Sequence, residues 1–274
     1  MPLAGVPLIV VAALAGLLIG SFLNVCVFRW PRDLSVVQPR SFCPGCEKMI
    51  AWYDNIPLLS FVLLKGRCRY CRDFIPWRYP LVEFATAVLF ALCFAAFGWS
   101  AQGAKYAVFS AILIALIASD AECRILPDEF TLGGTLIGLV FALFAPMDPF
   151  IITFLIPQSY APRWHWLAES ASSALVGGGL IWLVAFLYEK IRHREGMGLG
   201  DVKMISMIGA FLGLRMSLLT LMVASLAGAV GGAIYLKATR KDLSTYELPF
   251  GSFLGAVAMA LMLAAYVWPA LHSH

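Results

Sequence analysis

Gly196, Gly198 and Gly200 alternate with apolar residues and lead directly into Asp201. The run from Met204 to Leu214 that follows carries no charge, so a helix beginning here would hold a carboxylate at the mouth of a membrane span. An ionised carboxylate at the bilayer centre costs at least about 2.5 kcal/mol, and less toward the interface. Glycines let another chain approach the backbone closely. The stretch therefore favours a substrate-facing site, although a helix N-terminus with Asp201 as a cap or first-turn acid is the alternative.

Asp120 is a second acid at the end of an apolar run, and Leu126, Pro127 and Asp128 follow it closely. A carboxylate at the C-terminus of a helix opposes the helix dipole, whereas one at the start of a helix is favourable. We therefore expect Asp128 to cap the next helix, and we interpret the unfavourable Asp120 as a functional acid.

Asp120 and Asp201 are expected at the same membrane depth. The first closes a helix that runs toward one face, and the second opens a helix that leaves the same face. Two facing carboxylates cannot both ionise cheaply, so they would share a proton. In such a pair one carboxylate draws a proton from water while the other acid hydrogen-bonds the peptide carbonyl. This is the chemistry of an aspartic protease.

Two CxxC pairs, Cys43 with Cys46 and Cys68 with Cys71, are separated by 21 residues. Four thiolates can close a tetrahedron around Zn²⁺ with no open position, which predicts a structural metal. The surrounding stretch of about 50 residues is small for an unaided core. Disulfides are the alternative, but a cytosolic, reducing location disfavours them.

The composition is that of a multi-pass membrane protein, because 61% of the 274 residues are hydrophobic and only 13% are charged. We expect an all-α fold of about eight transmembrane helices and three parts: helix 1 over 1–28, a zinc-binding domain over 29–79 and a seven-helix peptidase core over 80–274. The first run lacks a preceding basic residue, so we interpret it as a retained span. The expected spans are Pro7–Phe28, Leu81–Trp99, Ala104–Ser119, Leu132–Ile156, Ala171–Tyr188, Val202–Leu214, Met216–Leu236 and Phe250–Trp268.

The positive charges indicate the orientation of these spans. All but Lys105, Arg163 and Arg215 of the 20 Lys and Arg residues fall on one side of an eight-span chain. The positive-inside rule places that side, with the cysteine pairs and both acids, in the cytosol and both termini outside. The net charge of +4 therefore reflects topology, and we expect lipid contacts and no nucleic-acid partner.

Two polar side chains near the first and second spans have two interpretations each. Asn24, after Gly20 in the first span, must find a partner inside the protein, and helix packing is favoured over a ligand contact. Glu83 falls just inside the second span, where it is either a partner of the helix dipole or a pocket acid.

Several motifs occur in an order that closely resembles the prepilin peptidase family, the type IV leader peptidases of pilus and type II secretion systems. They are Gly20-Ser21-Phe22-Leu23-Asn24-Val25, the two cysteine pairs, Arg78-Tyr79-Pro80-Leu81-Val82-Glu83, Asp120 to Asp128, Gly198-Leu199-Gly200-Asp201 and Pro249-Phe250-Gly251. The family's GxGD motif falls on Gly198, Gly200 and Asp201, and its first catalytic aspartate falls on Asp120. Ser252 departs from the pattern, since many members have a second proline there.

The resemblance implies an enzyme of the bacterial inner membrane with two activities. It would cut the basic leader from type IV prepilins or type II secretion pseudopilins after a glycine, at the cytosolic membrane face. It would then methylate the new N-terminal amine with S-adenosylmethionine. The resemblance points to the N-terminal half for the transferase, but no motif resembles a Rossmann methyl-donor site, so no residue is assigned to that cofactor.

Three other interpretations are open. The first is a peptidase without methyltransferase activity. The second is a transporter, which predicts repeat symmetry and acids near the midplane. The third is a non-catalytic scaffold that binds zinc, which would leave the unfavourable position of Asp120 unexplained.

Overall fold

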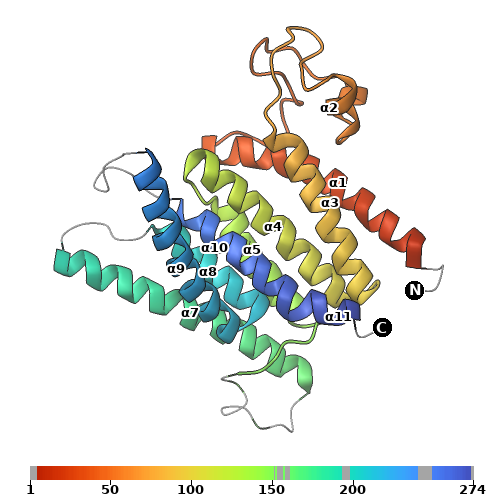
Figure 1. The fold of residues 1–274 in the computed structure, drawn as a ribbon. Coiled ribbons are helices and arrows are strands. Elements are labelled where there is room, and N and C mark those ends of the chain that lie inside the picture. The colour runs from red at the N-terminus through yellow and green to blue at the C-terminus, as the bar shows by residue number, and fades with distance from the viewer. Residues whose placement is uncertain are drawn as a thin grey trace.

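The computed structural model describes residues 5–150, 152, 157, 161–192, 198–239 and 249–272, and its long elements are all helices (Figure 1). The described residues contain no strand beyond two isolated bridges. This confirms the expected all-helical fold. The helices are α1 (Gly5–Arg29), η1 (Trp30–Arg32), η2 (Trp52–Asn55), α2 (Leu59–Leu63), α3 (Arg78–Phe97), α4 (Ala101–Cys123), α5 (Asp128–Phe141), α7 (Pro162–Arg192), α8 (Leu199–Leu212), α9 (Leu214–Thr239), α10 (Phe250–Met262), η3 (Leu263–Val267) and α11 (Trp268–His272).

Six of the described helical segments are long and apolar enough to cross a membrane. The expected fourth and sixth spans correspond to α5 and α8, which have 14 residues each. At 1.5 Å per residue such a helix is about 21 Å long, shorter than the hydrocarbon core of about 30 Å. The two short helices contact each other, and most of α8 is buried. Surrounding helices therefore shield α8 from lipid, which makes its short length tolerable.

The expected fourth span, Leu132–Ile156, is wrong in its extent. The helix α5 ends at Phe141, and an irregular segment follows. Pro146 and Pro149 lie in that segment, and proline cannot supply the N–H groups that a continuing helix needs. A span predicted from hydropathy alone does not include this interruption.

The fifth span begins earlier than expected. Its helix α7 starts at Pro162 rather than at Ala171, so part of the stretch expected as an external segment is helical. Proline suits the first position of a helix because the N–H that it lacks has no partner there.

Glycines allow close contact between α1 and α3. A Cβ added at Gly16 would lie 2.7 Å from the Cα of Ala87, and one added at Gly20 would lie 2.8 Å from the Cα of Glu83. These neighbours are backbone atoms that cannot move aside cheaply. Gly16 and Gly20 are about one helical turn apart, as in small-xxx-small contacts between membrane helices.

We expect Gly20→Val to weaken this contact and to lower the free energy of unfolding by about 1–3 kcal/mol, the usual cost of overpacking. Thermal unfolding in detergent measures the effect. The control is Leu18→Val, because Leu18 lies on the same helix and is 65% exposed. Equal melting temperatures for the two variants would contradict the close contact.

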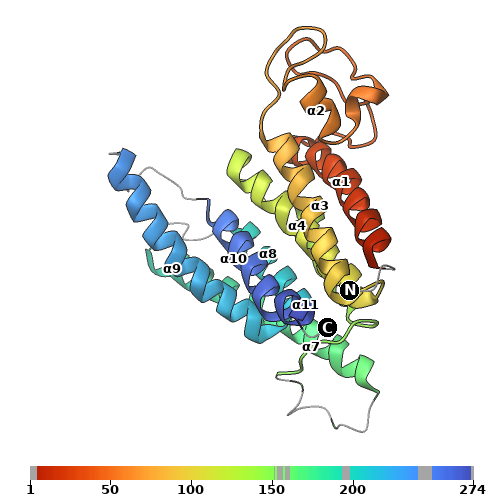
Figure 2. The same ribbon diagram turned by 45° about the vertical axis from the view of Figure 1, so that its right-hand side comes forward.

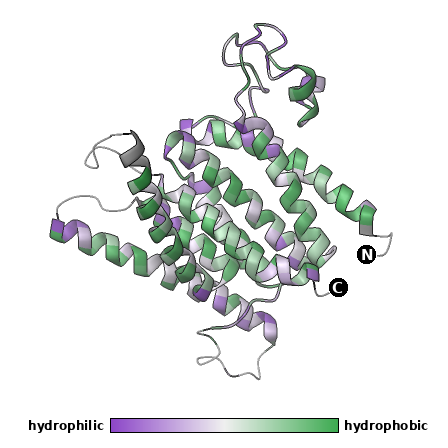
Figure 3. Cartoon of the chain, in the orientation of Figure 1, coloured by the Kyte–Doolittle hydropathy of each residue, from purple (hydrophilic) through white to green (hydrophobic). Residues whose placement is uncertain are grey.

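The segment between α1 and α3 projects from one end of the helix bundle, and both chain ends lie at the opposite end (Figures 1 and 2). Hydrophobic residues dominate the helices, while hydrophilic residues gather in the projecting segment and at helix ends (Figure 3). Apolar side chains such as Leu18 and Leu175 are mostly exposed on the helices. This pattern is that of a multi-pass membrane protein, with the outer helix surfaces facing lipid.

Candidate active site and metal centre

Asp120 lies in the last turn of α4 and is only 5% exposed. The helix ends at Arg124, which adopts a left-handed conformation and donates its N–H to the Asp120 carbonyl. The Ser119 hydroxyl donates to the Ile125 carbonyl at 2.8 Å and holds the following turn. As predicted, the acid therefore sits at the C-terminal end of a membrane helix, where the dipole opposes it.

The start of α10 supplies the hydrogen-bond partners of Asp120. The backbone N–H and the hydroxyl of Ser252 both donate to Asp120 Oδ2, at 2.5 and 2.7 Å. A Cβ at Gly251 would lie 3.1 Å from Asp120 Cγ and 3.0 Å from two carbons of Leu126. Gly251 belongs to helix α10, and the absence of a side chain there lets α10 approach the acid.

Asp201 lies in the first turn of α8 and is half-buried. Gly198 precedes the helix and has extended backbone angles, with no side-chain cap. Asp201 is therefore not a cap, whereas the alternative of a first-turn acid that meets the helix dipole agrees with its position. Leu126 is the nearest neighbour of a Cβ added at either Gly200 or Gly251. The two acids adjoin these glycines, so they lie near each other.

Of the predicted glycines, Gly198 and Gly200 adjoin this site, and Gly196 lies outside the described residues. A Cβ at Gly198 would meet no atom closer than 3.9 Å, where Asp201 Oδ2 lies, whereas one at Gly200 would lie 3.2 Å from Leu126. The extended backbone angles of Gly198 are ones that any residue can adopt. Neither its conformation nor packing against the described residues therefore requires glycine at position 198.

A surface ion pair links the helices that follow the two acids. Lys203 Nζ lies 2.6 and 2.9 Å from the two carboxylate oxygens of Asp128. Asp128 is the first residue of α5 but makes no capping hydrogen bond, so the expected cap is wrong and an ion pair replaces it. The pair is largely exposed and contributes about 0–1 kcal/mol.

Cys43, Cys46, Cys68 and Cys71 converge in the segment between α1 and α3, with all four sulfurs within 4.8 Å of one another. Each pair sits in a similar turn, because the N–H of Cys43 donates to Lys48 and that of Cys68 donates to Asp73. The Sγ atoms of Cys43 and Cys71 are 3.7 Å apart. Sulfurs on a tetrahedron around Zn²⁺ would be about 3.8 Å apart. The predicted cluster thus has the geometry of a metal site, and its cysteines are free thiols rather than disulfides.

The backbone favours the thiolate form of one cysteine in this cluster. Hydrogen bonds from the N–H groups of Cys71 and then Tyr70 lower the pKa of the Cys68 thiol to about 7. Thiolate is the form that binds a metal. Cys26, Cys93 and Cys123 lie apart from the cluster, as expected.

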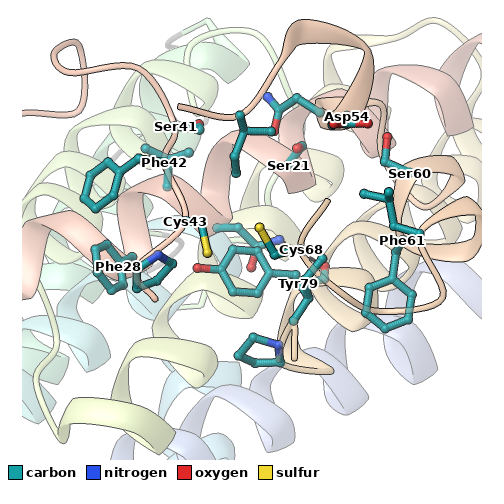
Figure 4. A pocket seen from close by; sticks show the side chains of 18 of the residues that line it. Ser21, Phe28, Ser41, Phe42, Cys43, Asp54, Ser60, Phe61, Cys68 and Tyr79 are labelled. Carbon is teal, nitrogen blue, oxygen red and sulfur yellow. Dashed lines mark hydrogen bonds between the residues drawn. The ribbon is translucent and has the colours of Figure 1, made fainter. Parts of the chain in front are cut away.

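A cavity of about 590 Å³ lies beside the cysteine cluster, between the projecting segment and the ends of α1 and α3 (Figure 4). Cys43 and Cys68 line it together with Asn24 and Glu83. Asn24 Nδ2 donates to the Tyr79 carbonyl at 3.0 Å, which is the helix contact favoured from the sequence. The cavity itself was not predicted, because it depends on how α1 and α3 are aligned.

The N-terminal part of the chain matches the family described as Bacterial Peptidase A24 N-terminal domain over residues 14–97, and residues 107–233 match the Type IV leader peptidase family. A Pseudomonas aeruginosa protein named prepilin leader peptidase/N-methyltransferase is 32% identical, over 91% of this chain and 88% of its own length. The chain belongs to the type IV leader peptidase family. This confirms the resemblance seen in the motifs.

Two more members of the type IV leader peptidase family carry the same name. The Neisseria gonorrhoeae protein is 33% identical over 81% of this chain and 80% of its own length. The Myxococcus xanthus protein is 39% identical over 82% of this chain, which spans 62% of that longer relative. No solved structure matches the chain.

Proposed function

We propose that this protein cleaves the leader from type IV prepilins or type II secretion pseudopilins and then methylates the new N-terminus with S-adenosylmethionine. The observation that carries the peptidase part is the pairing of two acids from distant helices beside an open backbone. The names of its relatives support both activities. A transporter or an inert scaffold would give no reason for Ser252 to hold the buried Asp120 carboxylate in one orientation.

In the proposed peptidase reaction, Asp120 and Asp201 share one proton. The ionised carboxylate takes a proton from water as the water oxygen attacks the scissile carbonyl carbon. The protonated acid donates a hydrogen bond to the carbonyl oxygen, and the leaving amine is protonated as the C–N bond breaks. Ser252 donates two hydrogen bonds to Oδ2 of Asp120, and these fix the orientation of the carboxylate.

The substrate path in this proposal follows from the position of the acids. A prepilin has a basic leader followed by an apolar helix, so its scissile bond would lie at the cytosolic membrane boundary. The acids lie at helix ends on the same side of the bundle as the cysteine-bearing segment, which supports this cytosolic location (Figure 1). Leu199 is 63% exposed next to Asp201, which leaves the site open to an incoming chain.

We expect Gly198→Val to block leader cleavage without unfolding the protein. Among the described residues, a Cβ at this position would meet only Asp201 Oδ2 at 3.9 Å and the backbone N of Gly200 at 4.0 Å. It would therefore fill the space proposed for the peptide beside the acid. Cleavage assays and thermal unfolding together check this.

Gly200→Val is the comparison variant for that experiment. Its side chain would press on Leu126, so we expect it to lower the melting temperature as well as the activity. If Gly198→Val cleaves at the wild-type rate, the peptide does not pass position 198.

The Ser252 hydroxyl is expected to position Asp120 for catalysis. Ser252→Ala keeps the backbone N–H but removes the hydroxyl, and one hydrogen bond to a charged group contributes enough to lower kcat about tenfold. KM should change by less than about twofold, because Ser252 does not bind the substrate in this proposal. Ser252→Thr should restore the rate, whereas an unchanged kcat in Ser252→Ala would contradict the positioning role.

We propose Zn²⁺ as the metal of the four-cysteine cluster, with a structural role. Cys43, Cys46, Cys68 and Cys71 would hold it and fold the segment around it. An all-thiolate set of four leaves no position for a substrate or water, so the ion would stabilise the segment and take no part in cleavage.

Incubation of the purified protein in lipid with a synthetic prepilin tests the proposed function. The expected product lacks the basic leader and begins directly after the glycine, as read by N-terminal sequencing. A pseudopilin in parallel establishes the substrate class. Intact substrate in both reactions, with protein that is folded, would refute the peptidase assignment.

A further inference from the structure

We propose that the cavity between the ends of α1 and α3 and the cysteine-bearing segment binds S-adenosylmethionine. This inference rests on the proposed function, since it locates the methyl donor of the second activity. The cavity volume of about 590 Å³ falls within the range of about 300–1,000 Å³ typical of small-molecule sites. Its walls come from α1, α3, the last turn of α4 and the projecting segment (Figure 4).

Two buried polar atoms on the cavity wall lack a partner. Asn24 Oδ1 is an unused acceptor and Arg78 Nε is an unused donor, and both side chains line the cavity. Asn24 lies beside the start of α3, because its amide donates to the carbonyl of Tyr79, the residue after Arg78. Buried polar groups without partners are costly. A free donor and a free acceptor in the wall of one cavity fit a ligand that carries a carboxylate and an ammonium group.

Glu83 adds a negative charge to the same wall. Its Oε2 accepts the N–H of Leu58 at 2.8 Å, and the side chain is buried and lines the cavity. Leu58 has a φ of 59°, a conformation that is strained for a residue other than glycine. The contact therefore fixes the projecting segment against α3. Of the two interpretations of Glu83 from the sequence, a pocket acid agrees with this position.

Several other charged groups around the cavity have partners. Arg69 donates two hydrogen bonds to Asp54, which holds the pKa of that carboxyl below its usual range. Arg29 donates to backbone carbonyls of the projecting segment. Among the described residues, the buried polar atoms of the cavity wall that lack a partner are those of Asn24 and Arg78.

The cavity also offers apolar and aromatic surface. Phe28, Phe61 and Tyr79 line it, and Figure 4 shows them on different sides of the space. Aromatic rings can stack on an adenine ring and attract a positive sulfonium through their faces. S-adenosylmethionine combines an adenine, a sulfonium and a zwitterionic amino-acid group, so this cavity fits each part of it.

The last turn of α4 connects this cavity with the two acids. Glu122 lines the cavity and forms an ion pair with Arg78, while Asp120 is hydrogen-bonded to α10. Residues two apart on a helix point about 200° from each other. The cleavage site and the cavity therefore flank the same helix end, so an N-terminus released at the acids has a short path to the donor.

The methyl transfer needs only the new N-terminus, S-adenosylmethionine and water. The nitrogen lone pair of the new N-terminus forms a bond to the methyl carbon as the carbon–sulfur bond breaks. The sulfur keeps the bonding electrons, so S-adenosylhomocysteine leaves as a neutral thioether. The proton that the nitrogen loses passes to solvent water.

Equilibrium binding of radiolabelled S-adenosylmethionine to the full protein in lipid nanodiscs tests the proposal. Glu83→Gln keeps an acceptor for Leu58 but removes the charge, and Arg78→Lys keeps a cation for Glu122 but removes Nε. We expect each to bind at least about tenfold more weakly than the wild type. Glu129→Gln is the matched control, because Glu129 is exposed and outside the cavity.

Leader cleavage in the same samples shows that the variants are folded. Weakened binding with cleavage retained supports the cavity as the donor site. Wild-type binding by both Glu83→Gln and Arg78→Lys would overturn it. A wild-type protein that cleaves prepilin but binds no S-adenosylmethionine would refute both the cavity assignment and the transferase activity, and would leave the peptidase assignment intact.

Discussion

Asp120→Asn and Asp201→Asn are each expected to lower leader cleavage by at least about 10³-fold, the upper range of what positioned acids and bases contribute. Asparagine preserves the size and the hydrogen-bonding shape of the side chain but cannot exchange a proton. The Ser252 N–H can still donate to the amide oxygen at position 120, so the fold around α4 and α10 should persist. Initial cleavage rates in membrane-inserted samples measure the effect.

Asp128→Asn and Glu122→Gln are the controls for these variants, and we expect both to retain most of the cleavage activity. Asp128 is paired with Lys203 on an exposed surface, and Glu122 is paired with Arg78. The double variant at positions 120 and 201 should be no slower than either single one, because residues that act as a unit are not additive. Robust cleavage by either single variant would remove the paired-acid assignment.

Cys46→Ser and Cys71→Ser are expected to lose the bound zinc, which should be present at about one ion per chain in the wild-type protein. Structural zinc contributes about 10 kcal/mol or more to the folding of small domains. The segment between α1 and α3 should therefore become sensitive to proteases. Elemental analysis and limited proteolysis of the purified variants provide the measurement.

Cys123→Ser is the control, since Cys123 is a free thiol outside the cluster and should not affect the zinc content. The cluster also forms part of the wall of the cavity proposed for S-adenosylmethionine, so loss of zinc should weaken donor binding too. A metal-free protein with an intact, protease-resistant segment would refute the structural role.

The sequence alone was sufficient to predict the features that depend on local spacing. The two CxxC pairs predicted the cysteine cluster, because each pair forms its own turn. The helix ends at Asp120 and Asp201 predicted that the two acids share a depth, because alternating spans bring such ends to one face. The first prediction needs only local spacing, and the second needs only the order of helices along the chain.

Features that depend on the alignment of distant helices could not be predicted. The hydrogen bonds from Ser252 to Asp120 join residues 132 apart in the sequence. The cavity requires Asn24, Arg78 and Glu83 to face one space, which the register of α1 against α3 decides. Hydropathy also predicts too long a helix where prolines interrupt an apolar run, as after Phe141.

A mass spectrum of prepilin incubated with S-adenosylmethionine and either the wild-type protein or Asp201→Asn tests the central claim most directly. For the wild type, we predict a first product that has lost only the leader and a second that has gained one methyl group. For Asp201→Asn, we predict intact prepilin with no methyl group, because no new N-terminus is released. Cleaved product from Asp201→Asn, or a methyl group on uncleaved prepilin, would contradict the account.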